Sequence, residues 1–192
     1  MHGGIYTTEY DLIHDQNSSA KKIEHPWEEC RGMGSSFGYN RNEGLEDYNS
    51  SAELIKILID KVSRGGNLLL NIGPTADGRI PVIMQQRLLD MGEWLRVNGE
   101  AIYGTRAWDK APAQKDKDVF YTIKGNDLYI LFTKYPVGKF SVPGIKSPTQ
   151  VNLLGSQEKV KFSGNNITAP VITPADQPCD HAWVFKVANA LK

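Results

Sequence analysis

Apolar residues recur with two different periods along the chain, and the first period is helical. Residues 54–62 carry Leu, Ile and Val at helical spacing, which predicts an amphipathic helix. Ser50 and Glu53 precede this stretch as a capping box, and Gly65-Gly66 follows it, so the helix is expected to lie between them. Residues 67–72, Asn-Leu-Leu-Leu-Asn-Ile, then form a short apolar run that predicts a strand buried on both faces.

A second helix is predicted from Pro81 to Asn98-Gly99, because proline suits a first helical turn and glycine ends a helix. Its expected inner stripe is Met84, Leu88, Met91 and Leu95, with Trp94 adding bulk. Helix, buried strand, loop and helix follow one another as in a parallel α/β sheet. Ligands of such folds bind at the carboxyl ends of the strands, so the loops after strands are the expected place of functional residues.

Beyond Trp108 the pattern changes to short strands separated by turns. Residues 111–118 are polar and predict a linker, and residues 119–123 and 128–133 flank a hairpin turn. Further strands are predicted at residues 139–142, 150–154, 159–162, 167–172 and 183–187. We therefore expect an α/β domain over residues 1–108 and an all-β domain, most simply a small β-sandwich, over residues 109–192.

The composition excludes several classes of function. The 192 residues hold 22 Lys and Arg against 22 Asp and Glu, and this zero balance argues against nucleic acid as the main partner. The apolar runs are too short to span a bilayer, and residues 1–4 predict no signal peptide in this chain. Cys30 and Cys179 make neither a disulfide scaffold nor a zinc motif, and we expect them to be buried or idle thiols.

Residues 1–48 hold the densest set of polar and aromatic side chains. Such a region suits a sugar site, because aromatic faces stack on pyranose rings and paired carboxyls perform the acid–base and nucleophilic steps. Any single glutamate there is more simply explained as a solvated loop residue, so only the clustering favours sugar. The four histidines lack metal-ligand spacing, and no phosphate loop or GxSxG element occurs, so no metal or cofactor is expected. The set comprises Glu9, His14, Glu24, His25, Trp27, Glu28, Glu29, Arg31, Tyr39, Arg41, Glu43 and Glu46.

Three blocks, in this order, resemble the α-L-fucosidases of glycoside hydrolase family 29. The first is residues 27–43, WEECRGMGSSFGYNRNE, and the second is residues 62–74, VSRGGNLLLNIGP, with Asp-Gly and Ile-Pro close behind. The third is Trp94-Leu95 followed by residues 98–105, NGEAIYGT. The resemblance covers residues 5–108 strongly, whereas the all-β remainder fits the family's C-terminal sandwich only by type.

The resemblance implies a (β/α)8-like barrel followed by a β-sandwich, and a retaining hydrolase that removes α-linked L-fucose through an aspartyl-fucosyl intermediate. The expected partner is a fucosylated oligosaccharide or glycoconjugate. The family's nucleophilic aspartate lies upstream, on an Asn-Asp-Arg type stretch that these residues lack. A complete barrel needs about 250 residues. The chain therefore resembles the C-terminal part of a fucosidase, with about three barrel strands, and needs the remaining N-terminal part of the barrel for activity.

Three residues take roles from the resemblance. Glu43 matches the general acid/base, Arg31 matches an arginine that hydrogen-bonds the sugar, and Leu68 falls where relatives place an apolar residue near the fucose C6 methyl. The position of the acid/base differs among branches of the family, so Glu9, Glu28 and Glu29 stay alternatives. Relatives are often secreted, periplasmic or lysosomal. The alternative function is a non-catalytic carbohydrate-binding or interaction module built on the sandwich.

Overall fold

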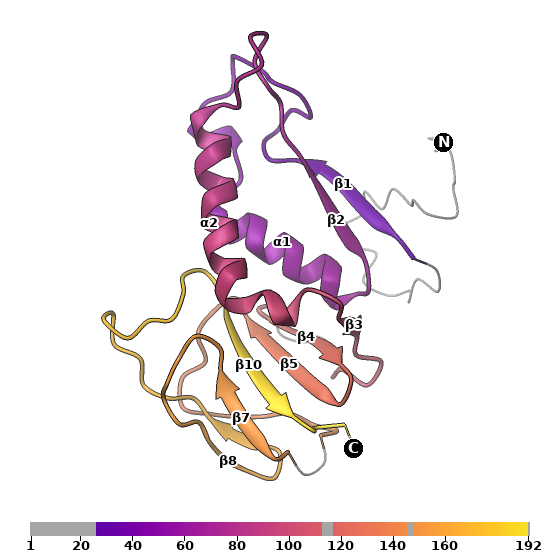
Figure 1. The fold of residues 1–192 in the computed structure, drawn as a ribbon, viewed down its shortest axis with the longest axis vertical. Helices are drawn as coiled ribbons and strands as arrows, with labels where there is room; N and C mark the ends of the chain where they lie inside the picture. Colours follow the sequence, from indigo (N-terminus) through magenta and orange to yellow (C-terminus); the bar gives the residue numbers. More distant parts are fainter. Residues whose placement is uncertain (1–25, 113–116, 146–147, 192) are drawn as a thin grey trace.

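The structure, a computed structural model, describes residues 26–112, 117–145 and 148–191. Two helices, α1 (Ser51–Ser63) and α2 (Val82–Asn98), pack beside a parallel pair of strands, β1 (Glu28–Gly32) and β2 (Asn67–Asn71). Below them in Figure 1 lie the antiparallel strands of the second half of the chain. No helix within the described ranges is long and apolar enough to cross a membrane.

Helix α1 confirms the capping prediction. The Ser50 hydroxyl accepts a hydrogen bond from the Glu53 amide, and the Glu53 carboxylate accepts one from the Ser50 amide at 2.7 Å. Gly65 then takes a positive φ of 84°, which glycine adopts without steric cost, and the chain turns into β2. Leu54, Ile55 and Ile59 are fully buried, so the predicted stripe faces the core.

Strand β2 forms where it was predicted, but the expectation that both of its faces are buried is wrong for the described residues. Leu70 of β2 packs against the core of the helices, as does Ile72, which follows the strand. In contrast, Leu69 is 50 % exposed. Successive side chains of a strand point to opposite faces. The helices cover one face of the β1–β2 pair, and no described element covers the other.

Strand β1 was not predicted, because its sequence, Glu-Glu-Cys-Arg-Gly, is too polar to suggest a buried strand. Its polar side chains are paired instead: Glu29 forms an ion pair with Lys61 of α1 at 2.7 Å. The parallel register places Glu29 opposite Leu68 and Arg31 opposite Leu70. The described residues thus hold two parallel strands, against about three expected from the resemblance.

Helix α2 begins after Pro81, as predicted, and continues into the short 3-10 helix η2 (Gly99–Ala101). Of the predicted stripe, Met84 and Met91 are buried, as is the neighbouring Trp94. Leu95 is partly buried, but Leu88 is exposed. A second 3-10 helix, η1 (Leu45–Asp47), lies between β1 and α1.

The second half is all-β, as expected. A five-stranded antiparallel sheet has the order β3-β4-β5-β10-β7, and a three-stranded sheet has the order β6-β9-β8. The strands β4 and β5 form the predicted hairpin, and every other predicted strand is present with shifted ends. The bounds are β3 (Arg106–Ala107), β4 (Val119–Lys124), β5 (Asp127–Phe132), β6 (Lys139–Ser141), β7 (Gln150–Leu153), β8 (Lys161–Ser163), β9 (Asn166–Thr168) and β10 (Trp183–Ala188).

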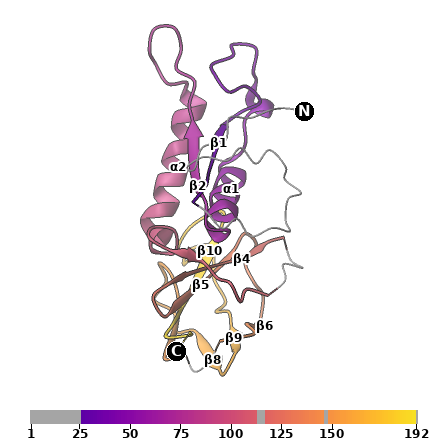
Figure 2. The same ribbon diagram turned by 90° about the vertical axis from the view of Figure 1, so that its right-hand side faces the viewer.

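The five-stranded sheet has a core on each face. Leu128 and Ile130 of β5 point toward the small sheet, whereas Tyr129 and Leu131 belong to the core shared with α1 and α2. The Trp94 indole nitrogen donates to the Ala182 carbonyl at 2.8 Å across this shared core. Figure 2 shows the resulting stack, with the helices above the sheets.

The division into domains at residue 108 stays a prediction. Strand β3 lies before this point, yet it pairs with β4 and so belongs to the five-stranded sheet. Part of the predicted linker, residues 113–116, lies outside the described residues.

Candidate active site

The loops that follow β1 and β2 meet at the carboxyl ends of the two parallel strands. They span residues 33–50 and 72–81 and rise beyond the same end of the strand pair in Figure 2. The Asn71 side-chain amide donates to the Phe37 carbonyl at 2.5 Å. A Cβ atom at Gly73 would lie only 2.2 Å from the Tyr39 amide nitrogen, so only glycine allows the loops this close.

Glu43 lies in the loop after β1, where the chain returns toward Ser36. Its two carboxylate oxygens have different surroundings. Oε1 accepts a hydrogen bond of 2.5 Å from the Ser36 amide. Oε2 is buried and makes no hydrogen bond of normal geometry to a described residue. A buried carboxylate oxygen without a partner is unfavourable unless a ligand or another part of the protein completes it.

Tyr48 flanks the same carboxylate. Burial raises the pKa of Tyr48, and the negative charge of Glu43 and a hydrogen bond to Glu43 raise it further. The phenol of Tyr48 therefore keeps its proton beside the carboxylate, but it makes no hydrogen bond of normal geometry to Glu43 Oε2. Gly34 pairs with Tyr48 through an isolated β-bridge, and a Cβ atom there would lie 3.1 Å from Glu43 Oε2. Tyr48, Gly34 and the Ser36 amide together fix the position of Glu43.

The loop that carries Glu43 is closed by its own hydrogen bonds. The Asn40 side chain donates to the Ser36 hydroxyl at 3.0 Å and accepts from the Asn42 amide at 3.0 Å. The Glu43 amide donates to the Asn40 carbonyl at 3.2 Å. The residues of the block that resembles the fucosidases thus build one ordered loop around one carboxylate.

The alternatives to Glu43 are placed differently. Glu29 accepts contacts from two cations, Lys61 at 2.7 Å and Arg31 at 3.4 Å, and its side chain is only 12 % exposed. These two ion pairs occupy both carboxylate oxygens of Glu29, which leaves neither oxygen free to face a glycosidic oxygen. Glu28 lies on the opposite face of β1 from Glu29. Glu9 lies outside the described residues, as do His14, Glu24 and His25.

Arg31 and Leu68 lie on the two parallel strands, and no hydrogen bond or ion pair joins either of them to Glu43 among the described residues. They lie on the same face of the strand pair as Glu29, and the ion pair between Glu29 and Lys61 shows that this face looks toward α1. Arg31 pairs with Glu29, while its buried Nε makes no hydrogen bond to a described residue. The roles of both residues in sugar binding stay predictions.

Neither thiol forms a disulfide. Cys30 and Cys179 are free and half-buried, and burial raises the pKa of Cys179. Among the residues that the structure describes, no group of three or more His, Cys, Asp or Glu side chains is arranged to hold a metal ion.

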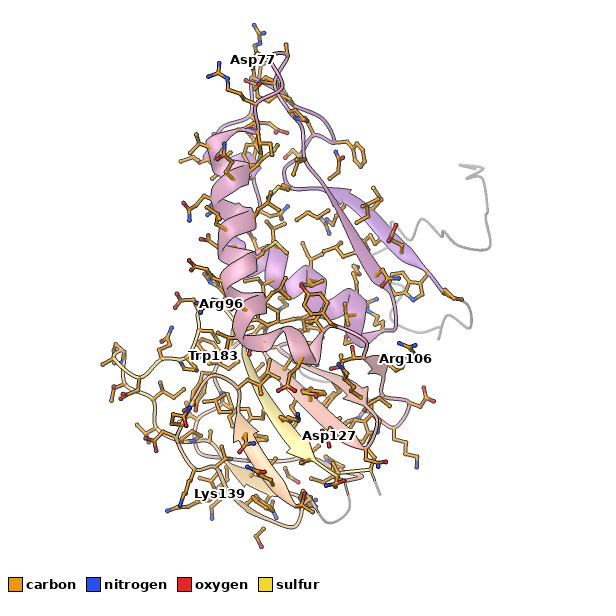
Figure 3. The ribbon with its side chains drawn as sticks, viewed as in Figure 1. Asp77, Arg96, Arg106, Asp127, Lys139 and Trp183 are labelled. Atoms are coloured by element: carbon orange, nitrogen blue, oxygen red, sulfur yellow. The ribbon has the colours of Figure 1, made fainter. Side chains whose placement is uncertain are left out.

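A cavity of about 140 Å³ lies elsewhere, between the C-terminal half of α2 and residues 178–181. Its lining includes Trp94, Arg96 and His181. In Figure 3 Arg96 lies on the side of α2 away from β1 and β2, and Asp77 marks the distant tip of the loop after β2. The cavity is therefore separate from the strand ends that hold Glu43.

The chain matches two family models over most of its length. Residues 2–100 match the model described as alpha-L-fucosidase, and residues 113–188 match the alpha-L-fucosidase C-terminal domain. The chain is 37 % identical to human plasma alpha-L-fucosidase and 38 % identical to human tissue alpha-L-fucosidase, covering 99 % and 98 % of this chain. It spans about two fifths of the length of these relatives, 42 % and 41 %.

Solved structures agree with the family match. The alpha-fucosidase of Thermotoga maritima in complex with fucose is 38 % identical to this chain, with a TM-score of 0.72 over 88 % of this chain and 41 % of its own. The same enzyme with a mechanism-based inhibitor gives a TM-score of 0.74 at 36 % identity, over 93 % and 42 %. The chain belongs to the α-L-fucosidase family. The expected fold class, part of a (β/α)8-like barrel followed by a β-sandwich, is confirmed.

Sequence reasoning missed the residues that surround Glu43. Ser36 and Tyr48 lie against the carboxylate. The Ser36 contact uses its backbone amide, and since every residue other than proline has one, the residue type could not predict this contact. The available signal was local: Gly34 and Gly38 mark a tight loop that leads back to Glu43. Phe37 was not singled out either, although it lies inside the matching block.

Proposed function

We propose that this chain provides the acid/base half of the active site of a retaining α-L-fucosidase, with Glu43 as the general acid/base. The observation that supports this role is the Glu43 carboxylate itself, at the carboxyl ends of parallel strands. The Ser36 amide binds its Oε1, while its buried Oε2 has no hydrogen-bond partner among the described residues. The glycosidic oxygen of a bound substrate would supply the missing hydrogen-bond partner of Oε2. The family membership supports the choice of α-linked L-fucose as the sugar.

The proposed reaction has two steps. An aspartate carboxylate, supplied by a part of the barrel upstream of this chain, attacks the anomeric carbon, and Glu43 gives its proton to the departing oxygen. In the second step Glu43, now a carboxylate, takes a proton from water, which attacks the fucosyl-aspartate ester and restores both carboxyl groups. Two inversions at the anomeric carbon leave its configuration retained.

The proposed roles of Arg31 and Leu68 in sugar binding rest on the family resemblance. Arg31 would donate to sugar hydroxyls through nitrogen atoms that Glu29 does not occupy, since its Nε has no hydrogen-bond partner among the described residues. Leu68 would line the space for the C6 methyl group, where a hexose would leave its 6-hydroxyl without a partner.

A hydrolysis assay tests the proposal. The full-length protein that contains this chain is expected to release the aryl group from an aryl α-L-fucoside, whereas the 192-residue chain alone is expected to be inactive because it lacks the nucleophilic aspartate. The corresponding β-L-fucoside and α-D-galactoside serve as controls. Turnover by the pure 192-residue chain would contradict the proposal that an upstream aspartate completes the active site. Fucose binding confined to residues 119–192 would favour a carbohydrate-binding module.

A further inference from the structure

Two aromatic rings are exposed on the loop that carries Glu43. Phe37 is 59 % exposed and Tyr39 is 43 % exposed, although burying an aromatic ring of this size is worth about 1.5–3 kcal/mol. Both rings leave apolar surface open on the same loop, one and three residues after Ser36, whose amide binds Glu43.

The backbone under these rings is held in place. The Phe37 carbonyl accepts a hydrogen bond from Asn71, and the Tyr39 backbone packs directly on Gly73. On the other side the Asn40 side chain ties the loop to Ser36. The rings are therefore displayed from a fixed support, which lowers the entropy cost of binding a ligand against them.

The position of the rings relative to Glu43 decides what they bind. A general acid must come within about 2.6–3.2 Å of the oxygen that it protonates. That oxygen joins the fucosyl ring to the leaving group. In the proposed site the fucosyl ring faces the nucleophilic aspartate, which this chain does not contain. The proposed site therefore places the leaving group against the loop 33–50, which carries Glu43 together with the exposed Phe37 and Tyr39.

We infer that Phe37 and Tyr39 bind the leaving-group sugar of the substrate and so favour fucose linked to a pyranose over fucose linked to a small group. This inference rests on the proposed function. The rings offer flat apolar faces to the C–H surface of a pyranose, and a neutral sugar requires no compensating charge.

Two substrates separate this role from a general effect on catalysis. The full-length protein is assayed on an α-L-fucosyl disaccharide and on α-L-fucosyl fluoride, whose leaving group has no ring. For Phe37→Ala and Tyr39→Ala, kcat/KM on the disaccharide is expected to fall about threefold to tenfold each, as for loss of an aromatic contact. On the fluoride, kcat/KM is expected to stay within about twofold, and this also shows that the variants fold.

Two control variants complete the experiment. Tyr39→Phe keeps the ring and is expected to keep most of the activity on the disaccharide. Tyr103→Ala removes another exposed aromatic side chain, which follows η2 at the far end of α2, and is expected to change neither activity.

The outcomes distinguish this inference from the proposed function. Equal losses on both substrates, or no loss on either, would overturn the binding role of the rings while the fucosidase activity stands. Failure of the unmodified full-length protein to hydrolyse either substrate would overturn the proposed function and this inference together.

Discussion

At the scale of single residues, the site depends on how closely the loop backbone approaches Glu43. The Ser36 backbone amide binds the carboxylate, and the phenol of Tyr48, whose pKa is raised by burial, lies beside it. Gly34 has no side chain that would collide with it. Such positioning matters for catalysis, because a displacement of about 1 Å can cost on the order of a hundredfold in rate.

Gly34 offers a direct test of this positioning. In Gly34→Ala the new Cβ would lie 3.1 Å from Glu43 Oε2 and 3.2 Å from the Tyr48 ring, so both must shift by a few tenths of an ångström. We expect kcat of the full-length protein on a fucosyl disaccharide to fall by about tenfold, with a small change in Tm.

Gly38→Ala is the matched control, because a Cβ at Gly38 meets no atom within 4 Å and the position has no positive φ. Its kcat should stay close to that of the unmodified protein. Equal losses in the two variants would mean that the loop responds to any added side chain and that the contact with Glu43 is unimportant.

At the scale of elements, Asp118 connects α1 to the hairpin of β4 and β5. Its carboxylate contacts Lys56 of α1 at 2.7 Å and Lys134 after β5 at 2.7 Å, and it accepts a hydrogen bond from the Thr133 hydroxyl. The hydrogen bonds to Lys134 and Lys56 hold the pKa of Asp118 well below its usual range. The charged form of Asp118 is therefore part of what holds these elements together.

The lowered pKa of Asp118 predicts a pH dependence. A carboxyl whose folded-state pKa is depressed stabilises the fold above its unfolded pKa of about 3.9, and this stabilisation is lost as the pH falls toward the folded value. Asp118→Asn is therefore expected to lower the free energy of unfolding by about 1 kcal/mol at pH 7 and by less near pH 2.5.

Urea unfolding at the two pH values measures this difference. Glu158→Gln, at an exposed position before β8, is the control and should change stability little at either pH. A deficit in Asp118→Asn that is the same at both pH values would show that its hydrogen bonds matter and its charge does not.

The elements also show what the sequence could and could not predict. Helix α1 was predictable because its cap and its ending glycines are local signals, and β2 because its apolar run is unbroken. Strand β1 was not, since its Glu29 is paired with Lys61 of α1, which lies far along the sequence. The exposure of Leu69 was also unpredictable, because burial of a strand face depends on which elements cover it.

For the candidate site, too, some features could be predicted from the sequence and others could not. The family motif predicted Glu43 as the acid/base, and that role stays a proposal; the structure shows its carboxylate bound by the Ser36 amide in a hydrogen-bonded loop. The motif could not show that Arg31 faces Glu29, because the face on which a strand residue lies depends on register and on the packing of α1.

At the scale of the whole molecule, the α/β part and the sandwich share one core. Residues from α1, α2, β4, β5 and β10 meet in it, and the hydrogen bond from Trp94 to Ala182 crosses it. The sandwich therefore supports the helices that pack on β1 and β2, while the opposite face of this strand pair has no cover among the described residues. That open face is where the remaining part of a barrel would lie, consistent with a site completed by an upstream aspartate.

The central claim, that Glu43 is the general acid/base of a retaining fucosidase, is tested most directly by Glu43→Gln in the full-length protein. Without the acid, hydrolysis of fucosides with poor leaving groups should slow most, whereas fucosyl fluoride needs no protonation and should still form the intermediate. Azide needs no general base, so it should restore turnover and yield a fucosyl azide of retained configuration. A variant with unchanged sensitivity to the leaving group and no rescue by azide would contradict the claim and assign the role to another carboxyl group.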